Sequence, residues 1–410
     1  MAGKKKKGKG KGRRKRIDEY QLRRNLREQA RRRDLEASEA AITMPKKDLS
    51  QYAEEIRLGG IEGGSTHSTL VIIDGKGTQL TEVKGPNTNH WTIGMTETAA
   101  RINAMVLRGK EALNIPETVP LDCLGLSLSG CEEEKTNRLL VETMQQNYPN
   151  VAKDYVVTSD TMGSLRTGLD TGGIVVIAGT GSNALMIDPD GKVTGCGGWG
   201  HMMGDEGSAY WIAYRACKYI FDDIDGLCQA PEPISYAYPA LRIFFNISDR
   251  KDMLPYLYTN FDKSKFASFA MEVANGCEKK DPLCLHILRE NGVLLAKHIV
   301  ALARKAGNDI KLHEGGLNVI CVGSVWKSWG FMKDAFLEEI HDSHAMDELT
   351  LLRLTASSAI GAGYLAAEKI DWIFTKPYEK NVNVLYHYKR ENYVKPTIKI
   401  ESEVQLVSCK

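Results

Sequence analysis

The sequence predicts an α/β fold made of two similar halves, and three observations carry this prediction. From about residue 56, short apolar segments alternate with segments of helical periodicity, as in sheets with helices on their faces. One order of segments occurs twice: strand, turn of Gly, Ser and Thr, strand, Asp-Gly-Lys turn, strand, helix, strand. An offset of 116 residues aligns the copies, pairing Gly63 with Gly179 and Asp74 with Asp190. We therefore expect a duplicated α/β domain with two lobes.

The first copy predicts five strands and two helices. Its second and third strands are joined by Asp74-Gly75-Lys76-Gly77, a sequence typical of a hairpin turn. The expected strands are 56–64, 66–74, 78–85, 121–130 and 154–160, and the expected helices are 95–114 and 135–149. These segments form a predicted first lobe over residues 56–170.

The second copy repeats this order and adds a long insertion. Its strands are expected at 172–181, 183–189, 192–198, 317–325 and 348–358, with helices at 207–224, 327–342 and 359–370. Residues 226–313 are helical in pattern and form the insertion. We therefore predict a second lobe over residues 171–390, followed by a tail at 391–410.

Charge is distributed unevenly along the 410 residues, whose formal net charge is only +2. Residues 1–33 contain 16 of the 54 basic residues and three acids, a net charge of +13, and the remainder carries −11. We predict that residues 1–50 form a basic extension that is largely disordered or helical. Residues 4–33 could bind nucleic acid, anionic lipid or an import receptor, or could be a solvated tail without a specific partner.

Targeting features point to an intracellular protein. No apolar run reaches the roughly eighteen residues that a membrane helix needs, and the basic start is not followed by the apolar segment of a secretory signal. The nine cysteines include no C-x-x-C pair, which predicts free thiols in a reducing compartment. We expect a cytoplasmic location, with the nucleus as a second one.

Two glycine-rich stretches, 179–184 and 195–200, match the pattern G-x-G-x-x-G/A. A dinucleotide fingerprint requires a helix directly after its glycines, but Pro189 and Gly191 interrupt any helix after the first stretch. The sequence also lacks the P-loop pattern G-x-x-x-x-G-K-[ST]. Glycines and hydroxyls in a hairpin can still bind phosphate through backbone N–H groups. Hairpins around 63–66 and 179–182 could therefore clamp a polyphosphate, or could be two tight turns of small residues.

The paired hairpins resemble the two phosphate motifs of the actin, heat-shock ATPase and sugar-kinase superfamily. Within it, six segments closely resemble animal N-acetylglucosamine kinases: NTNHW (87–91), LGLSLSG (124–130), TSD (158–160), GTGSN (179–183), GCGGWGHMMGDEGSAYWIA (195–213) and CVGSVWKSW (321–329). The resemblance covers about residues 58–388. It implies actin-like, ribonuclease H-like lobes around an interdomain cleft, ATP-dependent phosphorylation of N-acetylglucosamine at its 6-hydroxyl, Mg²⁺ arriving with ATP, and a homodimer.

The resemblance also implies the residues of the sugar side. Asp160 would be the general base that accepts the proton of the 6-hydroxyl, although Asp is also a favoured helix N-cap. The sugar itself would contact Asn89, Gly198, Trp199, Gly200 and Asp205. From the residues alone, Asn89 could be a turn residue, GCGGWG a plain glycine loop and Trp199 a core aromatic.

On the nucleotide side, the resemblance implies five residues. Thr66 and Thr180 match phosphate-contacting positions, Ser324 and Ser328 match the adenosine side, and Ala267 lies where relatives pack against the nucleotide. A small residue such as Ala267 is equally typical of a core.

Two positions depart from the pattern of the superfamily. Glu62 stands where many sugar kinases have the Asp that lies near Mg²⁺, and Ser65 stands where a third glycine is usual. No protein-held metal site is expected, because Cys196 and His201 lack a second pair of ligands.

Two alternative functions make different demands on the sequence. An actin-like ATPase that activates another enzyme would need a cysteine pair for an iron–sulfur cluster, and the sequence offers no convincing pair. A non-catalytic sugar sensor or scaffold, directed by the basic extension, would not need a base such as Asp160.

Overall fold

The structure is a computed structural model that describes residues 52–64 and 66–395. The predicted extension over 1–50, the contacts predicted for 4–33, the residue Ser65 and the tail from 396 onward lie outside the described residues. Within the described part, no helix is long and apolar enough to cross a membrane.

The first lobe contains a five-stranded sheet of order β3-β2-β1-β4-β5. Strands β1, β2 and β3 pair antiparallel, whereas β4 pairs in parallel with β1 and with β5. The strands are β1 Arg57–Gly63, β2 His67–Asp74, β3 Gln79–Pro86, β4 Cys123–Leu128 and β5 Tyr155–Thr158. The helices are α2 His90–Ile93, α3 Met95–Ala112, α4 Glu134–Asn147 and α5 Asp160–Gly168.

The second lobe contains a six-stranded sheet of order β11-β10-β9-β6-β7-β8. Its strands are β6 Gly173–Ala178, β7 Ser182–Ile187, β8 Val193–Gly197, β9 Leu317–Val322, β10 Glu348–Leu354 and β11 Val382–Lys389. Its α-helices are α6 Ala209–Asp225, α7 Ala237–Phe245, α8 Leu254–Leu257, α9 Lys263–Ser268, α10 Ala270–Glu278, α11 Pro282–Ala303, α12 Asn308–Lys311, α13 Trp329–Ser343 and α14 Ala359–Lys369. Short 3₁₀ helices are η2 Arg250–Met253, η3 Ser324–Ser328, η4 Tyr378–Asn381 and η5 Arg390–Asn392.

The two sheets have the same topology, which confirms the predicted duplication. Strands β6, β7, β8, β9 and β10 pair with one another in the same order and the same directions as β1 to β5. The predicted register was wrong at the second turn. Asp74 and Asp188 make the same two turn hydrogen bonds, and the equivalent glycines are Gly77 and Gly191, both with positive φ. The offset there is 114 residues.

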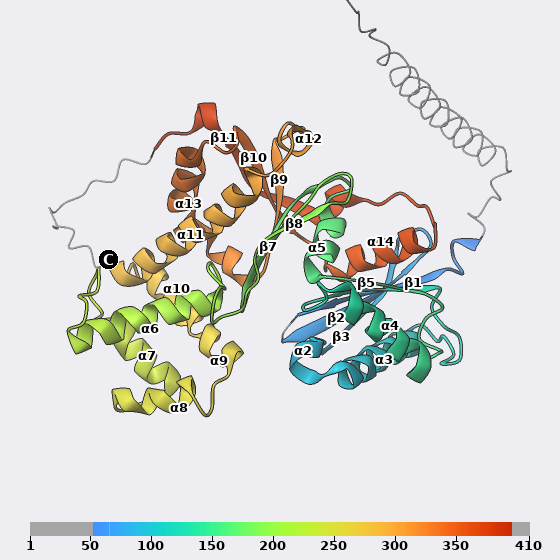
Figure 1. Cartoon of the computed structure of the whole chain (residues 1–410), viewed down its shortest axis with the longest axis horizontal. Coiled ribbons are helices and arrows are strands. Elements are labelled where there is room, and N and C mark those ends of the chain that lie inside the picture. The colour runs from blue at the N-terminus through green and yellow to red at the C-terminus, as the bar shows by residue number, and fades with distance from the viewer. Residues whose placement is uncertain (1–51, 65, 396–410) are drawn as a thin grey trace, which may run out of the picture. The chain divides into compact units, whose positions relative to one another are not determined.

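Four hydrophobic clusters divide the lobes into layers. Helices α3 and α4 cover one face of the first sheet, and α11 and α13 cover one face of the second (Figure 1). The other faces look toward each other and are covered by α14 on the first sheet and α5 on the second. Although α14 belongs to the end of the chain, it therefore packs on the first lobe, as its orange-red colour among blue strands shows (Figure 1).

Glycines let α5, α14 and the first sheet approach closely. A Cβ atom at Gly125 of β4 would lie 1.9 Å from the carbonyl oxygen of Ala362, and one at Gly361 would lie 2.0 Å from that of Gly163. Backbone atoms cannot move aside as a flexible side chain can, so larger residues are excluded. Buried hydroxyls of Ser164 and Ser358, 2.9 Å apart, join the two helices. This contact joins the helix that covers the second sheet to the helix that covers the first.

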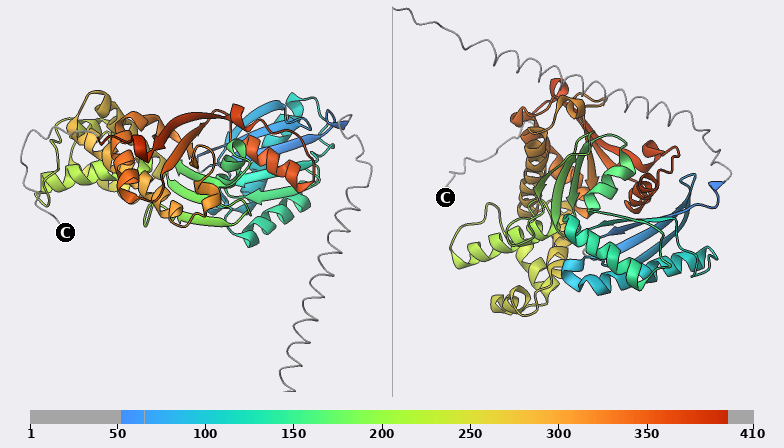
Figure 2. Two further views of the ribbon diagram at one scale, coloured as in Figure 1. Left: turned by 90° about the horizontal axis from the view of Figure 1, so that it is seen from above. Right: turned by 45° about the vertical axis from the view of Figure 1, so that its right-hand side comes forward.

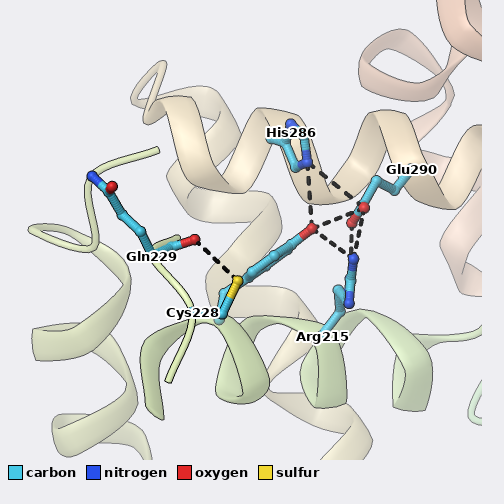
Figure 3. A network of polar contacts seen from close by, with 6 residues as sticks. Arg215, Cys228, Gln229, His286 and Glu290 are labelled. Atoms are coloured by element: carbon cyan, nitrogen blue, oxygen red, sulfur yellow. Dashed lines mark hydrogen bonds and ion pairs between the residues drawn. The ribbon is translucent and has the colours of Figure 1, made fainter. Parts of the chain in front are cut away.

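Every regular element within the predicted insertion, residues 226–313, is a helix. Helices α6 to α10 form a group at one end of the second lobe, visible from all three directions (Figures 1 and 2). A polar network joins α6 to α11: Arg215 donates to Glu290 at 3.0 Å, and Tyr219 donates to the same carboxylate at 2.8 Å (Figure 3). Hydrogen bonds from His286, Arg215 and Tyr219 outweigh burial, which acts in the opposite direction, and lower the pKa of Glu290 to about 2.

Candidate active site

A cleft of about 690 Å³ is lined by residues of both lobes. The first lobe contributes the β1–β2 hairpin, the loop after β4 and the start of α5. The second contributes the β6–β7 hairpin, the loop after β8, the start of α9 and the loop after β9. Eight of the residues predicted from the sequence line this cleft: Thr66, Asn89, Asp160, Thr180, Gly198, Gly200, Asp205 and Ser324.

Asp160 occupies the first position of α5, directly after strand β5. Its side chain does not cap the helix, since Ser159 is the N-cap residue and the helix has no side-chain cap bond. The carboxylate instead accepts a short hydrogen bond from the hydroxyl of Ser129, which follows β4. The parallel pairing of β4 with β5 brings these two strand ends together. The helix N-cap alternative for Asp160 was therefore wrong.

The surroundings of Asp160 set its pKa. The residue is only partly accessible from the cleft, and protein atoms surround its carboxyl group. Burial, together with the nearby carboxylates of Glu132 and Glu62, raises the pKa of Asp160 to about 6. The hydrogen bonds from Ser129 and from the backbone of Thr161 lower this pKa, but their effect is smaller than the combined effect of burial and charge. A carboxylate with this pKa is ionised at neutral pH and is a stronger proton acceptor than an ordinary Asp.

Glu62 lies on β1 at the start of the first hairpin and also lines the cleft. Burial raises its pKa, while a hydrogen bond of 3.2 Å from the hydroxyl of Ser357 acts in the opposite direction. Ser357 belongs to the segment between β10 and α14. Glu62 thus connects the first hairpin to the segment that crosses back from the second lobe.

The second hairpin has open donors directed at the cleft. Gly179 donates to the carbonyl of Gly181 at 2.9 Å and closes the turn. In the described part of the chain, the backbone N–H groups of Thr180 and Gly181 have no protein acceptor. A Cβ at Gly179 would meet no atom within 4 Å, so the protein leaves free space at this residue. Free N–H groups beside free space fit the phosphates of a nucleotide.

The loop after β8 turns sharply on glycines. Gly197, Gly198 and Gly200 have φ of 86°, 81° and 75°, values that other residues rarely adopt. The turn carries Gly198 and Gly200 to the cleft wall. A side chain at Gly198 would also collide with Asn183, since its Cβ would lie 2.9 Å from the amide oxygen of Asn183. The backbone conformation itself therefore requires these glycines. The plain glycine loop considered from the sequence has the same requirement.

Asn89 faces the cleft from the first lobe and also serves as N-cap of α2. Its Oδ1 accepts from the backbone N–H of Trp91 at 2.9 Å. The indole of Trp91 donates to the carbonyl of Gly130 at 3.0 Å and so holds this corner of the cleft. Within residues 52–64 and 66–395, the amide nitrogen of Asn89 makes no hydrogen bond to the protein, so it can donate to a ligand.

Asp205 is buried and has a left-handed backbone with φ of 66°. One carboxylate oxygen accepts from the backbone N–H of Ser182 at 3.0 Å, and the other lies 2.6 Å from the ammonium of Lys263. Asp205 therefore connects the second hairpin to helix α9. A sugar hydroxyl would have to share these oxygens with their protein partners.

Three predicted residues do not line the cleft. Trp199 is 74% exposed, which also excludes its core alternative. Ala267 is buried in α9 with 2% of its surface exposed, as its core alternative requires. Ser328 lies at the end of η3, one turn beyond Ser324. The ligand contacts of these three residues stay predictions of the resemblance.

Several cleft residues had no predicted role. Ser129 lies in the quoted motif LGLSLSG, and its position after a strand was a usable signal. Glu132 follows a few residues later in the same loop. His67, Lys263 and Lys327 also line the cleft, but nothing in their local sequence distinguishes them from other surface residues.

Two lobes that share a five-stranded topology, with a glycine-rich hairpin from each and a carboxylate between them, define a two-lobed nucleotide-binding enzyme of the actin-like class. The chain belongs to the BadF/BadG/BcrA/BcrD ATPase family, whose model matches residues 60–363. Membership of an ATPase family implies the use of ATP.

Similar proteins include sugar kinases. N-acetyl-D-glucosamine kinase of Dictyostelium discoideum is 26% identical over 319 residues, which cover 75% of this chain and 96% of the relative. The N-acetylmuramic acid/N-acetylglucosamine kinase of Clostridium acetobutylicum is 25% identical over 318 residues, which cover 76% of this chain and 98% of the relative. The predicted resemblance is thereby confirmed.

Solved structures agree on the fold. A protein of Chromobacterium violaceum assigned as an N-acetylglucosamine kinase superposes with a TM-score of 0.61 at 23% identity, over 76% of this chain and 99% of that one. A similarly assigned protein of Porphyromonas gingivalis gives a TM-score of 0.56 at 19% identity, over 75% of this chain and 97% of that one. The predicted actin-like fold is confirmed.

Proposed function

We propose that this protein is an ATP-dependent kinase that phosphorylates N-acetylglucosamine at the 6-hydroxyl. The observation that carries the proposal is the position of Asp160, at the start of α5 in a cleft that both hairpins line. The names of the Dictyostelium and Clostridium relatives support the choice of sugar.

In the proposed reaction, Asp160 accepts the proton of the 6-hydroxyl while that oxygen bonds to the γ-phosphorus of ATP. The bond between this phosphorus and the β,γ-bridging oxygen breaks, and ADP leaves. Ser129 holds the carboxylate of Asp160 in one orientation. The backbone N–H groups of the second hairpin bind phosphate oxygens, and closure of the lobes would exclude water as a competing acceptor.

Mg²⁺ fits this site as a companion of ATP. Bound between phosphate oxygens, it would neutralise charge that develops during transfer. Among the residues present, Glu62 and Asp160 are carboxylates that could hold its water ligands from the first lobe. The replacement of the usual Asp by Glu62 moves this carboxylate one methylene further along its side chain.

The two alternatives receive less support. An activator with an iron–sulfur cluster needs accessible cysteines, but six of the eight described cysteines are buried, spread over three separate clusters: Cys123, Cys131, Cys217, Cys277, Cys284 and Cys321. A sensor or scaffold would have no use for a carboxylate with a raised pKa between two phosphate-binding hairpins. A homodimer and a cytoplasmic or nuclear location stay predictions.

The test measures ADP release with N-acetylglucosamine, N-acetylmannosamine, glucose or no sugar, and identifies the phosphorylated product. N-acetylglucosamine should stimulate turnover and yield the 6-phosphate. Asp160→Asn should abolish turnover and still bind the sugar, and it should unfold at the same or a higher temperature, because a neutral amide avoids the cost of burying charge. An absence of stimulation by any sugar would refute the proposal.

A further inference from the structure

Helix α9 brings one cation to the tip of the second hairpin. The ammonium of Lys263 lies 2.6 Å from the carboxylate of Asp205, and the lysine side chain is 31% exposed whereas that of Asp205 is 4% exposed. The pair therefore has a buried acidic end and an accessible basic end. The accessible end lines the cleft.

The hairpin lies within contact distance of this ammonium. A Cβ atom placed on Gly181 would lie 3.0 Å from Nζ of Lys263 and 2.6 Å from Oδ1 of Asp205. The same Oδ1 accepts from the backbone of Ser182. Lys263, Asp205 and the hairpin are thus one connected unit, and the ammonium sits beside the N–H groups that find no acceptor among the described residues.

We propose that Lys263 is a phosphate-binding residue of the nucleotide site, and that Asp205 positions it there. An ammonium carries three donors, and Asp205 engages it from one side only. A polyphosphate at the hairpin would take the remaining donors in charge-assisted hydrogen bonds, which are among the strong ones in proteins. This inference rests on the nucleotide site of the proposed function but does not depend on the identity of the sugar.

The neighbouring residues of α9 favour Lys263 over other members of the helix. Asp262 caps the helix by accepting from the backbone of Lys265 at 2.9 Å. The ammonium of Lys265 lies over the ring of Tyr256, 4.6 Å from its centre, and does not line the cleft. Ala267, which the resemblance assigned to the nucleotide, is buried. The residue of this segment that faces the cleft is Lys263.

The positioning role given to Asp205 is additional to the sugar contact that the resemblance implies. Asp205→Asn would keep an oxygen to accept from Ser182 but would remove the charge that holds Lys263. It should weaken nucleotide binding less than Lys263→Met does, because the cation is retained but no longer fixed.

The experiment measures the binding of adenosine, AMP, ADP and ATP by calorimetry, without sugar. The proteins are the wild type, Lys263→Met, Lys263→Arg and the matched control Lys265→Met, which removes the same charge from the same helix. Lys263→Met should lose about 10-fold to 100-fold in affinity for ADP and ATP, as expected for one charge-assisted contact, and nothing for adenosine. Lys263→Arg should retain most of the affinity, and Lys265→Met should match the wild type throughout.

Two results would overturn the proposal: unchanged affinity of Lys263→Met for ATP, or an equal loss for adenosine and ATP. Melting temperatures within a few degrees of the wild type establish that the variants are folded. Because the series contains no sugar, it holds or fails independently of the proposed substrate. If no sugar stimulates turnover but the phosphate-dependent loss is seen, the proposed function fails and the role of Lys263 stands.

Discussion

The hydroxyl of Ser129 should control the pH dependence of the reaction. It donates to the carboxylate of Asp160 and thereby stabilises the ionised form, so its removal raises the pKa of Asp160 above its present value of about 6. One hydrogen bond to a charged group contributes about 1.5 kcal/mol, which corresponds to about one pKa unit. Because the base must be ionised to accept a proton, the acidic limb of activity should move upward by about one unit in Ser129→Ala.

The assay is kcat/KM for N-acetylglucosamine between pH 5 and 9, since this ratio reports the pKa of the free enzyme. Ser129→Ala should lose activity more strongly at pH 6 than at pH 8. Ser127→Ala serves as matched control, because this hydroxyl, on β4 two residues before Ser129, contacts Thr158 at 3.1 Å and does not line the cleft. An acidic limb that stays in place, or moves downward, in Ser129→Ala would refute the assignment of Asp160 as the titrating base.

Two further predictions concern stability. Glu290→Gln should lower the free energy of unfolding by about 1–2 kcal/mol at pH 7, a value discounted for the partial exposure of Glu290. Because folding depresses the pKa of Glu290 from 4.5 to about 2, the difference in stability from the wild type should shrink as the pH falls below 4.5. Equal stability of the two proteins at pH 7 would contradict this prediction. Gly125→Ala should lower the free energy of unfolding, measured in urea, by about 1–3 kcal/mol, because its Cβ would lie 1.9 Å from a carbonyl of α14. The control Gly195→Ala should be nearly neutral, because its Cβ would meet no atom within 4 Å.

Much of the fold could be predicted because its signals are local. Apolar strands, helical periodicity and turn residues marked the first ten strands, and the repeat indicated the duplication. The packing of α14 on the first sheet could not be predicted, because it depends on the close approach of Gly60 and Gly125 to a helix more than 200 residues away. Strand β11 was missed although Val382, Val384 and Tyr386 alternate with other residues, since it begins directly after the irregular segment 370–381.

The site was predictable where chemistry follows a strand or a hairpin. Asp160, Thr180 and the glycine loop could be found from their motifs, and the structure brings them to one cleft. Lys263 could not be found, because its importance comes from the fold of the insertion and from the partner Asp205, 58 positions earlier. Ala267 was indicated by the resemblance alone; it is buried in α9, one turn from Lys263, and its nucleotide contact stays a prediction.

The most direct test of the proposed reaction is the release of ADP by the wild type and by Asp160→Asn, with and without N-acetylglucosamine, alongside calorimetric binding of the sugar. With Asp160 as the base of a sugar kinase, the sugar should stimulate the wild type many-fold, its 6-phosphate should accumulate in step with ADP, and Asp160→Asn should bind sugar without turnover. Sugar-independent ADP release by the wild type, or turnover by Asp160→Asn close to that of the wild type, would contradict it.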